Sequence, residues 1–379
     1  MNILFETHLN RDILIEILIK LPITDLVLNV GKLNKFFNSL VIESIKYYRH
    51  LVYEYKFRDF RIHEFVNITS FDVGMYTRIT DKEICKLTAL TNLHLGFAKY
   101  ITDIGISNLT SLISFNSGFK SLITNKGICK LTSLTDLDLG LNTVITDKGI
   151  YKLKSLRCLN LGWNELITDS GISKLISLTN LDLGCGRGNI TDKGINKLIS
   201  LTNLNLGKNK IVTNRGISSL TSLKYLYLGQ NENITDIAVR KLTALTELDL
   251  GWNELITDYG IHQLTSLISF NLSCNNNITY RGIYKLTSLT SLDLEANTNI
   301  SNEGISRLTS LTSLDLGLNG NINDETISKL TSLMYLNLGS NTIISDHGIS
   351  KLTSLTTLEL GQNTNITIEG TRGLLFLSK

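Results

Sequence analysis

The side chains that most often carry catalysis or bind metals are scattered through this sequence without the spacing that either role requires. The five cysteines include no C-x-x-C pair, so they predict reduced thiols in a cytosol-like compartment and neither a disulfide framework nor a zinc site. The six histidines have no metal-ligand spacing. The residues concerned are Cys85, Cys129, Cys158, Cys185, Cys274, His8, His50, His63, His94, His262 and His347.

Two other patterns resemble ligand sites only superficially. The glycine-rich segment 184–188 lacks the Lys-Ser/Thr pair of a phosphate-binding loop. Aspartates recur at long regular intervals, whereas a calcium loop gathers its ligands within about a dozen residues. We therefore expect a chain that is not an enzyme and that uses no metal and no cofactor.

Aromatic and acidic side chains, by contrast, recur in two regular rows whose chemistry is that of a protein-binding surface. Both tryptophans fall in one row, and the acidic row lies three residues before it and contains no lysine or arginine. Acidic groups attract a basic partner, and aromatic rings supply apolar anchors. We hypothesise that these rows bind a protein or peptide bearing basic groups; the alternative is a solvated acidic row with the rings half-buried at strand ends. The residues predicted to bind the target are Phe97, Phe119, Asp138, Trp163, Asp182, Tyr227, Asp249 and Trp252.

An internal repeat positions these rows. With its anchor leucine as position 1, the unit reads L-T-S-L-T-x-L-x-L-G-x-N-x-x-I-T-D-x-G-I-x-K. Successive anchors are 22 residues apart, except for 23 between Leu175 and Leu198. A period this short indicates stacked supersecondary units. The anchors are Leu87, Leu109, Leu131, Leu153, Leu175, Leu198, Leu220, Leu242, Leu264, Leu286, Leu308, Leu330, Leu352 and Leu374.

Each position of the unit has an expected structural role. Leucines at positions 7 and 9 alternate, which predicts a strand with one buried face and with positions 6, 8 and 11 pointing outward. Asparagine at position 12 can bond through its amide to backbone groups of the next coil. Threonine and aspartate at positions 16 and 17 predict a helix start, and glycine at position 19 lets adjacent helical segments approach closely. Lysine at position 22, as in Lys130 and Lys241, falls on the helical side, so the two faces carry opposite charge.

The spacing L-x-x-L-x-L-x-x-N resembles the leucine-rich repeat, and the ending N-x-x-I-T-D-x-G-I is similar to the subclass in which that asparagine is often cysteine. The resemblance implies an α/β solenoid, a horseshoe with a parallel sheet on its concave face and short helices on its convex face. It covers residues 65–379 as fourteen units followed by a C-terminal stub. The unit is short for that subclass, which leaves the length of the convex helix open.

Residues 1–48 have a different pattern, in which apolar side chains share one helical face while Glu16 and Lys20 lie opposite. The order from Leu9 to Leu26 resembles the F-box core L-P-x-E-I-L-x-x-I-L-x-x-L-P-x-x-D-L, with Asn10 in place of the first proline. The resemblance implies a helical F-box-like domain that docks on a Skp-type adaptor of a cullin ubiquitin ligase, followed by a helical linker or cap at 49–64. The residues implied in docking are Leu9, Ile13, Leu14, Ile17, Leu18, Leu21, Pro22 and Leu26.

The two resemblances identify the chain as similar to the F-box/leucine-rich-repeat family. They imply a substrate-recruiting subunit of the ubiquitin ligase, which binds its target on the concave face. The alternative is an interaction scaffold or effector in which the N-terminal helices merely cap the solenoid. Either protein would be cytoplasmic, in a host cell's cytoplasm if the chain is viral or an effector.

Nucleic acid and membrane are not expected as partners. A formal charge of +3 is too small to indicate nucleic-acid binding, and the aromatics that alternate with basic residues in segment 43–64 are expected to pack this linker on the first repeat. Asp12, Glu16 and Lys20 interrupt every apolar run near the N-terminus, so neither a signal peptide nor a membrane span is expected.

Overall fold

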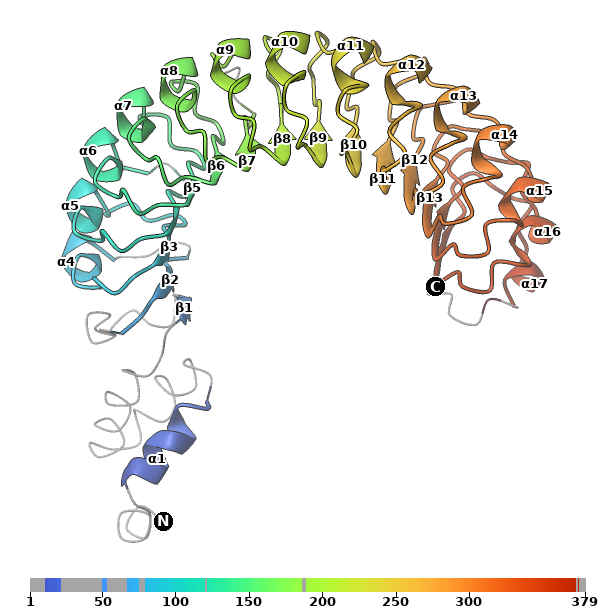
Figure 1. Ribbon diagram of the computed structural model, residues 1–379. Coiled ribbons are helices and arrows are strands. Elements are labelled where there is room, and N and C mark those ends of the chain that lie inside the picture. The colour runs from blue at the N-terminus through green and yellow to red at the C-terminus, as the bar shows by residue number, and fades with distance from the viewer. Residues whose placement is uncertain are drawn as a thin grey trace, which may run out of the picture. The chain divides into compact units, whose positions relative to one another are not determined.

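The computed structural model describes residues 11–21, 50–52, 67–74, 79–119, 121–185, 189–372 and 374. The chain divides into two compact units, unit 1 (Met1–Ser177) and unit 2 (Leu178–Lys379). Each unit is a stack of coils, in which one short parallel strand and one helical turn alternate (Figure 1).

Unit 1 has its strands on the inner side of the stack and its one-turn helices on the outer side (Figure 1). The strands, paired in parallel in chain order, are β1 (His50–Val52), β2 (Ser70–Asp72), β3 (Asn92–His94), β4 (Ser114–Asn116), β5 (Asp136–Asp138) and β6 (Cys158–Asn160). The one-turn helices are α4 (Asp81–Ile84), α5 (Asp103–Ile106), α6 (Asn125–Ile128), α7 (Asp147–Ile150) and α8 (Asp169–Ile172), and the eight-residue helix α1 (Arg11–Leu18) precedes the strands in the chain.

Unit 2 has the same inner strands and outer helices. Its parallel strands are β7 (Asn180–Asp182), β8 (Asn203–Asn205), β9 (Tyr225–Tyr227), β10 (Glu247–Asp249), β11 (Ser269–Asn271), β12 (Ser291–Asp293), β13 (Ser313–Asp315), β14 (Tyr335–Asn337) and β15 (Thr357–Glu359). Its helices are α9 (Asp192–Ile195), α10 (Asn214–Ile217), α11 (Asp236–Val239), α12 (Asp258–Ile261), α13 (Tyr280–Ile283), α14 (Asn302–Ile305), α15 (Asp324–Ile327), α16 (Asp346–Ile349) and α17 (Ile368–Thr371).

Strand β1 lies in the segment 49–64, for which the sequence predicted a helical linker. It pairs in parallel with β2, and His50 aligns with Ser70 while Val52 aligns with Asp72. Without it, one edge of β2 would present a row of unpaired N–H and C=O groups, which a strand satisfies and a helix cannot. At these residues the structure therefore differs from the prediction.

The strands align equivalent positions of neighbouring repeats, so position 7 of each repeat packs beside position 7 of the next. Leu248, for example, aligns with Phe270, which aligns with Leu292. All three side chains are buried, whereas positions 6 and 8 on either side of them are at least partly exposed. The other apolar positions of the same unit are also buried, at Leu242, Leu245, Leu250, Ile256 and Ile261. The predicted core is confirmed.

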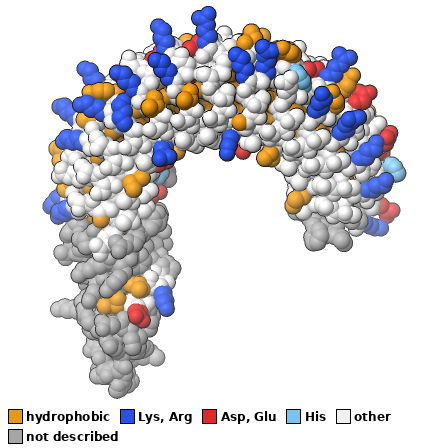
Figure 2. Space-filling view, in the orientation of Figure 1, with side chains coloured by type: hydrophobic (Ala, Val, Ile, Leu, Met, Phe, Trp, Pro, Cys, Tyr) orange, Lys and Arg blue, Asp and Glu red, His pale blue; other side chains and the backbone are white. Residues whose placement is uncertain are grey.

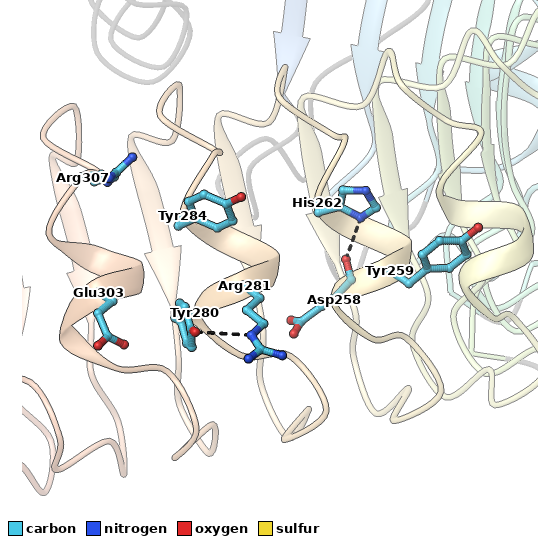
Figure 3. Close-up of a pocket in the computed structure, with 8 residues that line it drawn as sticks. All are labelled: Asp258, Tyr259, His262, Tyr280, Arg281, Tyr284, Glu303 and Arg307. Carbon is cyan, nitrogen blue, oxygen red and sulfur yellow. Dashed lines mark hydrogen bonds between the residues drawn. The ribbon is translucent and has the colours of Figure 1, made fainter.

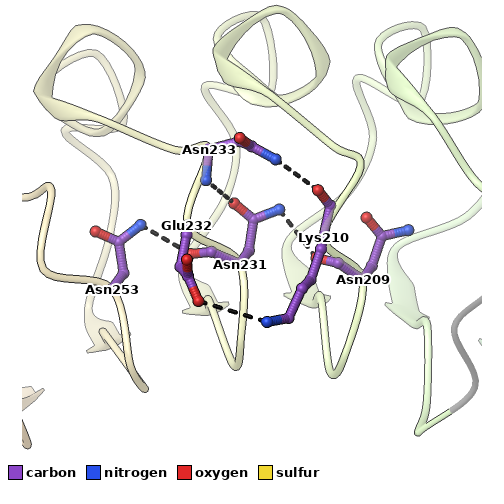
Figure 4. A network of polar contacts seen from close by, with 6 residues as sticks. All are labelled: Asn209, Lys210, Asn231, Glu232, Asn233 and Asn253. Carbon is purple, nitrogen blue, oxygen red and sulfur yellow. Dashed lines mark hydrogen bonds and ion pairs between the residues drawn. The ribbon is translucent and has the colours of Figure 1, made fainter.

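The asparagines at position 12 form a buried ladder that ties each coil to its neighbour (Figure 4). Asn231 donates from Nδ2 to the carbonyl oxygens of Asn209 (3.0 Å) and Val212 (2.8 Å) in the preceding repeat. Its Oδ1 accepts from the backbone N–H groups of Asn233 (2.9 Å) and Ile234 (3.1 Å). The sequence predicted bonds to the next coil, and the direction is the reverse, because the carbonyl groups within reach of the amide belong to the coil before it.

A second ladder runs along the outer helices and was not identified from the sequence. Asp236 accepts from the backbone N–H and the Oγ1 hydroxyl of Thr257, one repeat later, at 2.8 and 2.7 Å. The same Oγ1 accepts from the N–H of Tyr259 at 3.2 Å and so caps helix α12. The predicted helix start is confirmed, and each threonine also links two coils.

Most repeats carry glycine at the two positions where coils meet most closely. At position 19, a Cβ added to Gly260 would lie 2.3 Å from Oδ1 of Asp236, which confirms the predicted close approach. At position 10, Gly229 has a φ of +59°, and a Cβ there would lie 1.9 Å from the carbonyl oxygen of Gly207. The backbone of each turn therefore rests directly on the turn before it.

None of the described helices is both long enough and apolar enough to span a membrane.

Candidate functional site

The row of aromatic side chains at position 11 lies in the turns after the strands, within reach of a partner on the inner side. Trp163 is 52% exposed, Trp252 66% and Phe119 37%. Trp252 is mostly exposed, whereas Trp163 and Phe119 are half-buried, and all three keep ring surface open to solvent. They are available as apolar anchors.

In unit 1 the rings line a continuous hollow surface, here called the aromatic groove (Phe97, Phe119, Leu141, Val144 and Trp163). The ring centroids of Phe97 and Phe119 are 4.9 Å apart. A depression of about 390 Å³ lies over Phe97, Phe119 and Leu141. A second depression of about 680 Å³ lies over Phe119, Leu141, Val144 and Trp163. The structure therefore brings Phe97, Phe119 and Trp163 of the predicted target-binding residues together, whereas Trp252 lies in unit 2.

In unit 2 the outward positions form an acidic surface, here called the acidic face (Glu247, Asp249, Asp293, Asp315 and Glu359). Burial raises the pKa of Asp249, although the N–H of Gly251 donates to it. Burial also raises the pKa of Asp293, and the neighbouring carboxylates of Asp315 and Asp249 add to the effect. Negative charge is thus crowded and poorly solvated on this face, a condition that a basic ligand relieves.

Tyrosines stand among these carboxylates. Burial, followed by the charge of Asp249, raises the pKa of the hydroxyls of Tyr225 and Tyr227. Burial and then Glu359 do the same for Tyr335. These phenols stay protonated at neutral pH and can donate hydrogen bonds. Tyr225 and Asp249 also line a small depression of about 220 Å³.

The acidic and amide side chains at position 8 have a structural role that the sequence analysis missed. Oδ1 of Asp249 accepts from the N–H of Gly251 at 2.7 Å, and Oδ1 of Asn337 accepts from the N–H of Gly339 at 2.9 Å. One oxygen therefore holds the turn that follows the strand, in the manner of an Asx-turn. This role explains why aspartate and asparagine predominate at position 8. In several repeats the second carboxylate oxygen accepts from a neighbouring asparagine, as that of Asp315 does from Nδ2 of Asn337 at 3.0 Å.

The remaining predicted target-binding residues are distributed over both units. Asp138, in unit 1, accepts from the N–H of Gly140 at 2.7 Å and from Nδ2 of Asn116 at 3.0 Å. In unit 2, Asp182 accepts from Nδ2 of Asn205 at 3.1 Å. Both aspartates are already engaged, so they contribute charge more than free hydrogen-bonding capacity.

The predicted adaptor-binding residues lie only partly within the described chain. Helix α1 is present, with Leu14 and Leu18 buried (7% and 5% exposed) and Leu21 half-buried. Ile13 and Ile17 lie on this helix. Leu9, Pro22 and Leu26 lie outside the described residues. The described part of this segment contains one helix, α1, and both the F-box-like domain and its docking on an adaptor stay predictions.

The cysteines are free thiols. Burial, reinforced by Asp136, raises the pKa of Cys158 to about 11, so this thiol is protonated and a poor nucleophile at neutral pH. Across the described ranges, no group of three His, Cys, Asp or Glu side chains is placed to hold a metal ion.

Comparisons with known proteins agree with this geometry. A family model described as Leucine Rich repeat matches residues 130–154, 152–176, 241–261, 263–286, 285–308, 307–330 and 329–352. A search of curated proteins gives no match.

Among solved structures, an internalin (inlF) from Listeria monocytogenes is 24% identical, with a TM-score of 0.54 over 94% of this chain and 93% of that one. The leucine-rich-repeat protein LIC12759 from Leptospira interrogans is 23% identical, with a TM-score of 0.60 over 90% and 97%. A TLR13–ssRNA13 complex is 21% identical, with a TM-score of 0.52 over 84% of this chain and 57% of that one. These likenesses concern the fold. The matched segments are therefore leucine-rich repeats, and the parallel strands and short helices of both units match the leucine-rich-repeat fold.

Proposed function

We propose that this chain is a protein–protein interaction module that binds its target on the inner, strand-bearing side of the repeats and has no catalytic activity of its own. The observation that carries the proposal is the acidic face, where carboxylates with raised pKa values crowd the strands of unit 2. It favours a target that bears basic groups. The aromatic groove of unit 1 supplies a separate apolar contact surface.

The acidic face is tested by replacing Asp249 and Asp293 with asparagine. Asparagine occupies the same position naturally at Asn271, where its Oδ1 accepts from the N–H of Ser273 at 2.8 Å, so the turn is retained while the charge is lost. A fluorescein-labelled peptide of lysine and leucine should bind the double variant about tenfold more weakly, since each exposed charge pair contributes roughly 0.2–1 kcal/mol.

The matched control is Asp346→Asn, which removes a charge from helix α16 on the outer side. It should leave the affinity unchanged. Equal affinity of the double variant and the unchanged protein would refute a role for the acidic face.

The exposed tryptophans are tested separately. Changing Trp163 and Trp252 to alanine should abolish capture of the target without unfolding the repeats, because half or more of the surface of each residue is exposed. Unchanged capture would remove these residues from the binding surface.

At a finer level, we propose that the target is recruited to a cullin ubiquitin ligase, with the N-terminal segment docked on a Skp-type adaptor in the cytoplasm. Support comes from the F-box-like order of residues 9–26, from the amphipathic helix α1 and from the repeats that follow. The competing function is a scaffold or effector whose N-terminal helices only cap the repeats.

The two functions differ in one measurement. A purified Skp-type adaptor should bind the full chain and not a chain lacking residues 1–40, as measured by calorimetry. If the full chain fails to bind while the truncated chain loses thermal stability, the N-terminal segment is a cap.

A further inference from the structure

The outer side of unit 2 carries a cluster of tyrosine and arginine side chains that the inner surfaces do not explain. Tyr259, Tyr280, Arg281, Tyr284 and Arg307, here called the tyrosine–arginine cluster, line a depression of about 640 Å³ over helices α12 to α14 (Figure 3). Along the outer side, lysine and arginine side chains are interspersed with apolar ones (Figure 2).

The cluster interrupts a structural ladder. Position 17 carries aspartate or asparagine in every helix from α4 to α16 except α13, which begins at Tyr280. The aspartate one repeat earlier, Asp258, accepts from both the N–H and the Oγ1 of Thr279, at 2.8 and 2.7 Å. Tyr280 offers no such acceptor to Ser301, and Ser301 caps α14 without a side-chain cap bond.

Tyr280 thus gives up two inter-coil bonds, while Asn276 of the same repeat accepts from the N–H of Thr298 at 2.9 Å and from Nδ2 of Asn299 at 2.6 Å. A repeat that departs from its own consensus where the fold calls for another residue is typical of a functional position. The hydroxyl of Tyr280 instead accepts from Nε of Arg281 at 3.3 Å, which directs both side chains to the surface.

Cations lie against all three tyrosine rings. The guanidinium of Arg240 is 5.0 Å from the ring centroid of Tyr259, that of Arg281 is 5.7 Å from Tyr280, and the ammonium of Lys285 is 5.5 Å from Tyr284. A guanidinium stacked on a ring keeps its N–H edge available for a carboxylate.

Four cations surround the depression, Arg281 and Arg307 with the flanking Arg240 and Lys285, and two carboxylates lie among them, so a net positive charge remains. Arg281 and Arg307 form no ion pair with any carboxylate of the described residues. The carboxylates are Asp258, which belongs to the ladder and acts electrostatically on Arg281, and Glu303, which accepts from the hydroxyl of Ser301 at 3.0 Å. The surface is therefore suited to an anionic partner.

We propose that the tyrosine–arginine cluster is a docking surface for an acidic peptide segment of a partner protein. Carboxylates of the segment accept from Arg281 and Arg307 and from tyrosine hydroxyls, and its apolar side chains pack on the rings. A peptide fits better than a single-stranded nucleic acid, because bases need free ring faces and these rings are already covered by cations. The site is on the helical side and does not depend on the inner surfaces.

The test uses the full chain and a fluorescein-labelled peptide of glutamate and leucine, with glutamine replacing glutamate in a control peptide. The double variant Arg281→Gln/Arg307→Gln should bind the glutamate peptide about tenfold more weakly. Arg215→Gln is the matched control, because Arg215 is exposed at the same helix position on α10. It should leave the affinity unchanged.

A second variant separates binding from stability. Tyr280→Asn restores the ladder without adding charge, since Asn214 at this position bonds to the N–H and Oγ1 of Thr235 at 2.9 and 2.8 Å. It should weaken peptide binding while raising the midpoint of thermal unfolding. Loss of binding together with a raised midpoint supports the proposal, because unfolding cannot explain it.

Three results would overturn the proposal: equal affinity for the glutamine peptide, no effect of the double variant, or a lower unfolding midpoint for Tyr280→Asn. The proposal would also be overturned if oligouridine bound more tightly than the glutamate peptide and the double variant lost this oligouridine binding. That result would assign the surface to nucleic acid.

Discussion

Replacing Asn231 with alanine should be among the most destabilising single changes in the repeats, although it removes no charge and little apolar surface. The side chain is fully buried. It makes four hydrogen bonds, two to carbonyl oxygens of the preceding repeat and two from N–H groups of its own turn (Figure 4). Alanine leaves these backbone groups without their partner in a space closed to water.

The expected cost follows from the number of groups left unsatisfied. A buried donor or acceptor that loses its partner costs about 1–3 kcal/mol. Some of these groups will relax toward one another, so we expect a loss of about 4 kcal/mol in the free energy of unfolding at Asn231. That figure exceeds what most single surface substitutions cause, about 0.5 kcal/mol.

The matched control is Asn233→Ala in the same turn. Asn233 is exposed, and its Nδ2 donates to the carbonyl oxygen of Lys210 at the surface, where water can replace it. Its loss should cost about 1 kcal/mol or less. Both variants are compared with the unchanged protein by urea unfolding followed by circular dichroism.

Two results would contradict this reasoning. Equal losses for Asn231→Ala and Asn233→Ala would mean that burial does not set the strength of the ladder. A shallower urea transition for Asn231→Ala, rather than a shifted one, would mean that the stack separates into independently unfolding parts.

Two further predictions concern glycine and pH. Gly229→Ala should lower stability by several kcal/mol in thermal unfolding, because its φ is +59° and the new Cβ would lie 1.9 Å from the carbonyl oxygen of Gly207, whereas Gly320→Ala, with nothing within 4 Å, should be neutral. Burial raises the pKa of Asp249 and Asp293, so both protonate earlier than ordinary carboxylates as pH falls, and the lysine–leucine peptide should bind progressively more weakly below neutral pH in a fluorescence titration. Because the pKa of Asp249 is raised in the folded protein, the contribution of this carboxyl to stability is greatest below its unfolded-state pKa and is lost as pH rises through its folded-state pKa. Asp249→Asn should therefore raise the midpoint of thermal unfolding at neutral pH. A lowered midpoint would contradict this expectation.

The sequence by itself determined the repeat and its interior. The period, the buried leucines and isoleucines, the asparagine of the turn and the helix cap are each set by spacing within one unit. Alternation fixes which side of a short strand faces inward, and a threonine followed by aspartate starts a helix whatever lies beside it. For this reason the core at residues such as Leu248 and Ile261 could be read directly from the sequence.

Only the tertiary structure decided how the coils bond to one another. The direction of the Asn231 bonds, the Asp236–Thr257 ladder and the pairing of β1 with β2 join groups about twenty residues apart, and their geometry depends on how one coil is placed on the next. The same holds for both candidate surfaces. Sequence spacing put Trp163 and Asp249 in rows, but exposure of the ring and burial of the carboxylate depend on neighbouring repeats.

The tyrosine–arginine cluster shows this limit most clearly. Tyr259, Tyr280 and Arg307 belong to three different repeats, and only Tyr280 departs from the consensus in chemical type, so the sequence gives no sign that they meet. Stacking places them around one depression, because helical turns at equivalent positions are brought side by side. A local pattern specifies each coil, whereas a surface shared by several coils exists only once they are stacked.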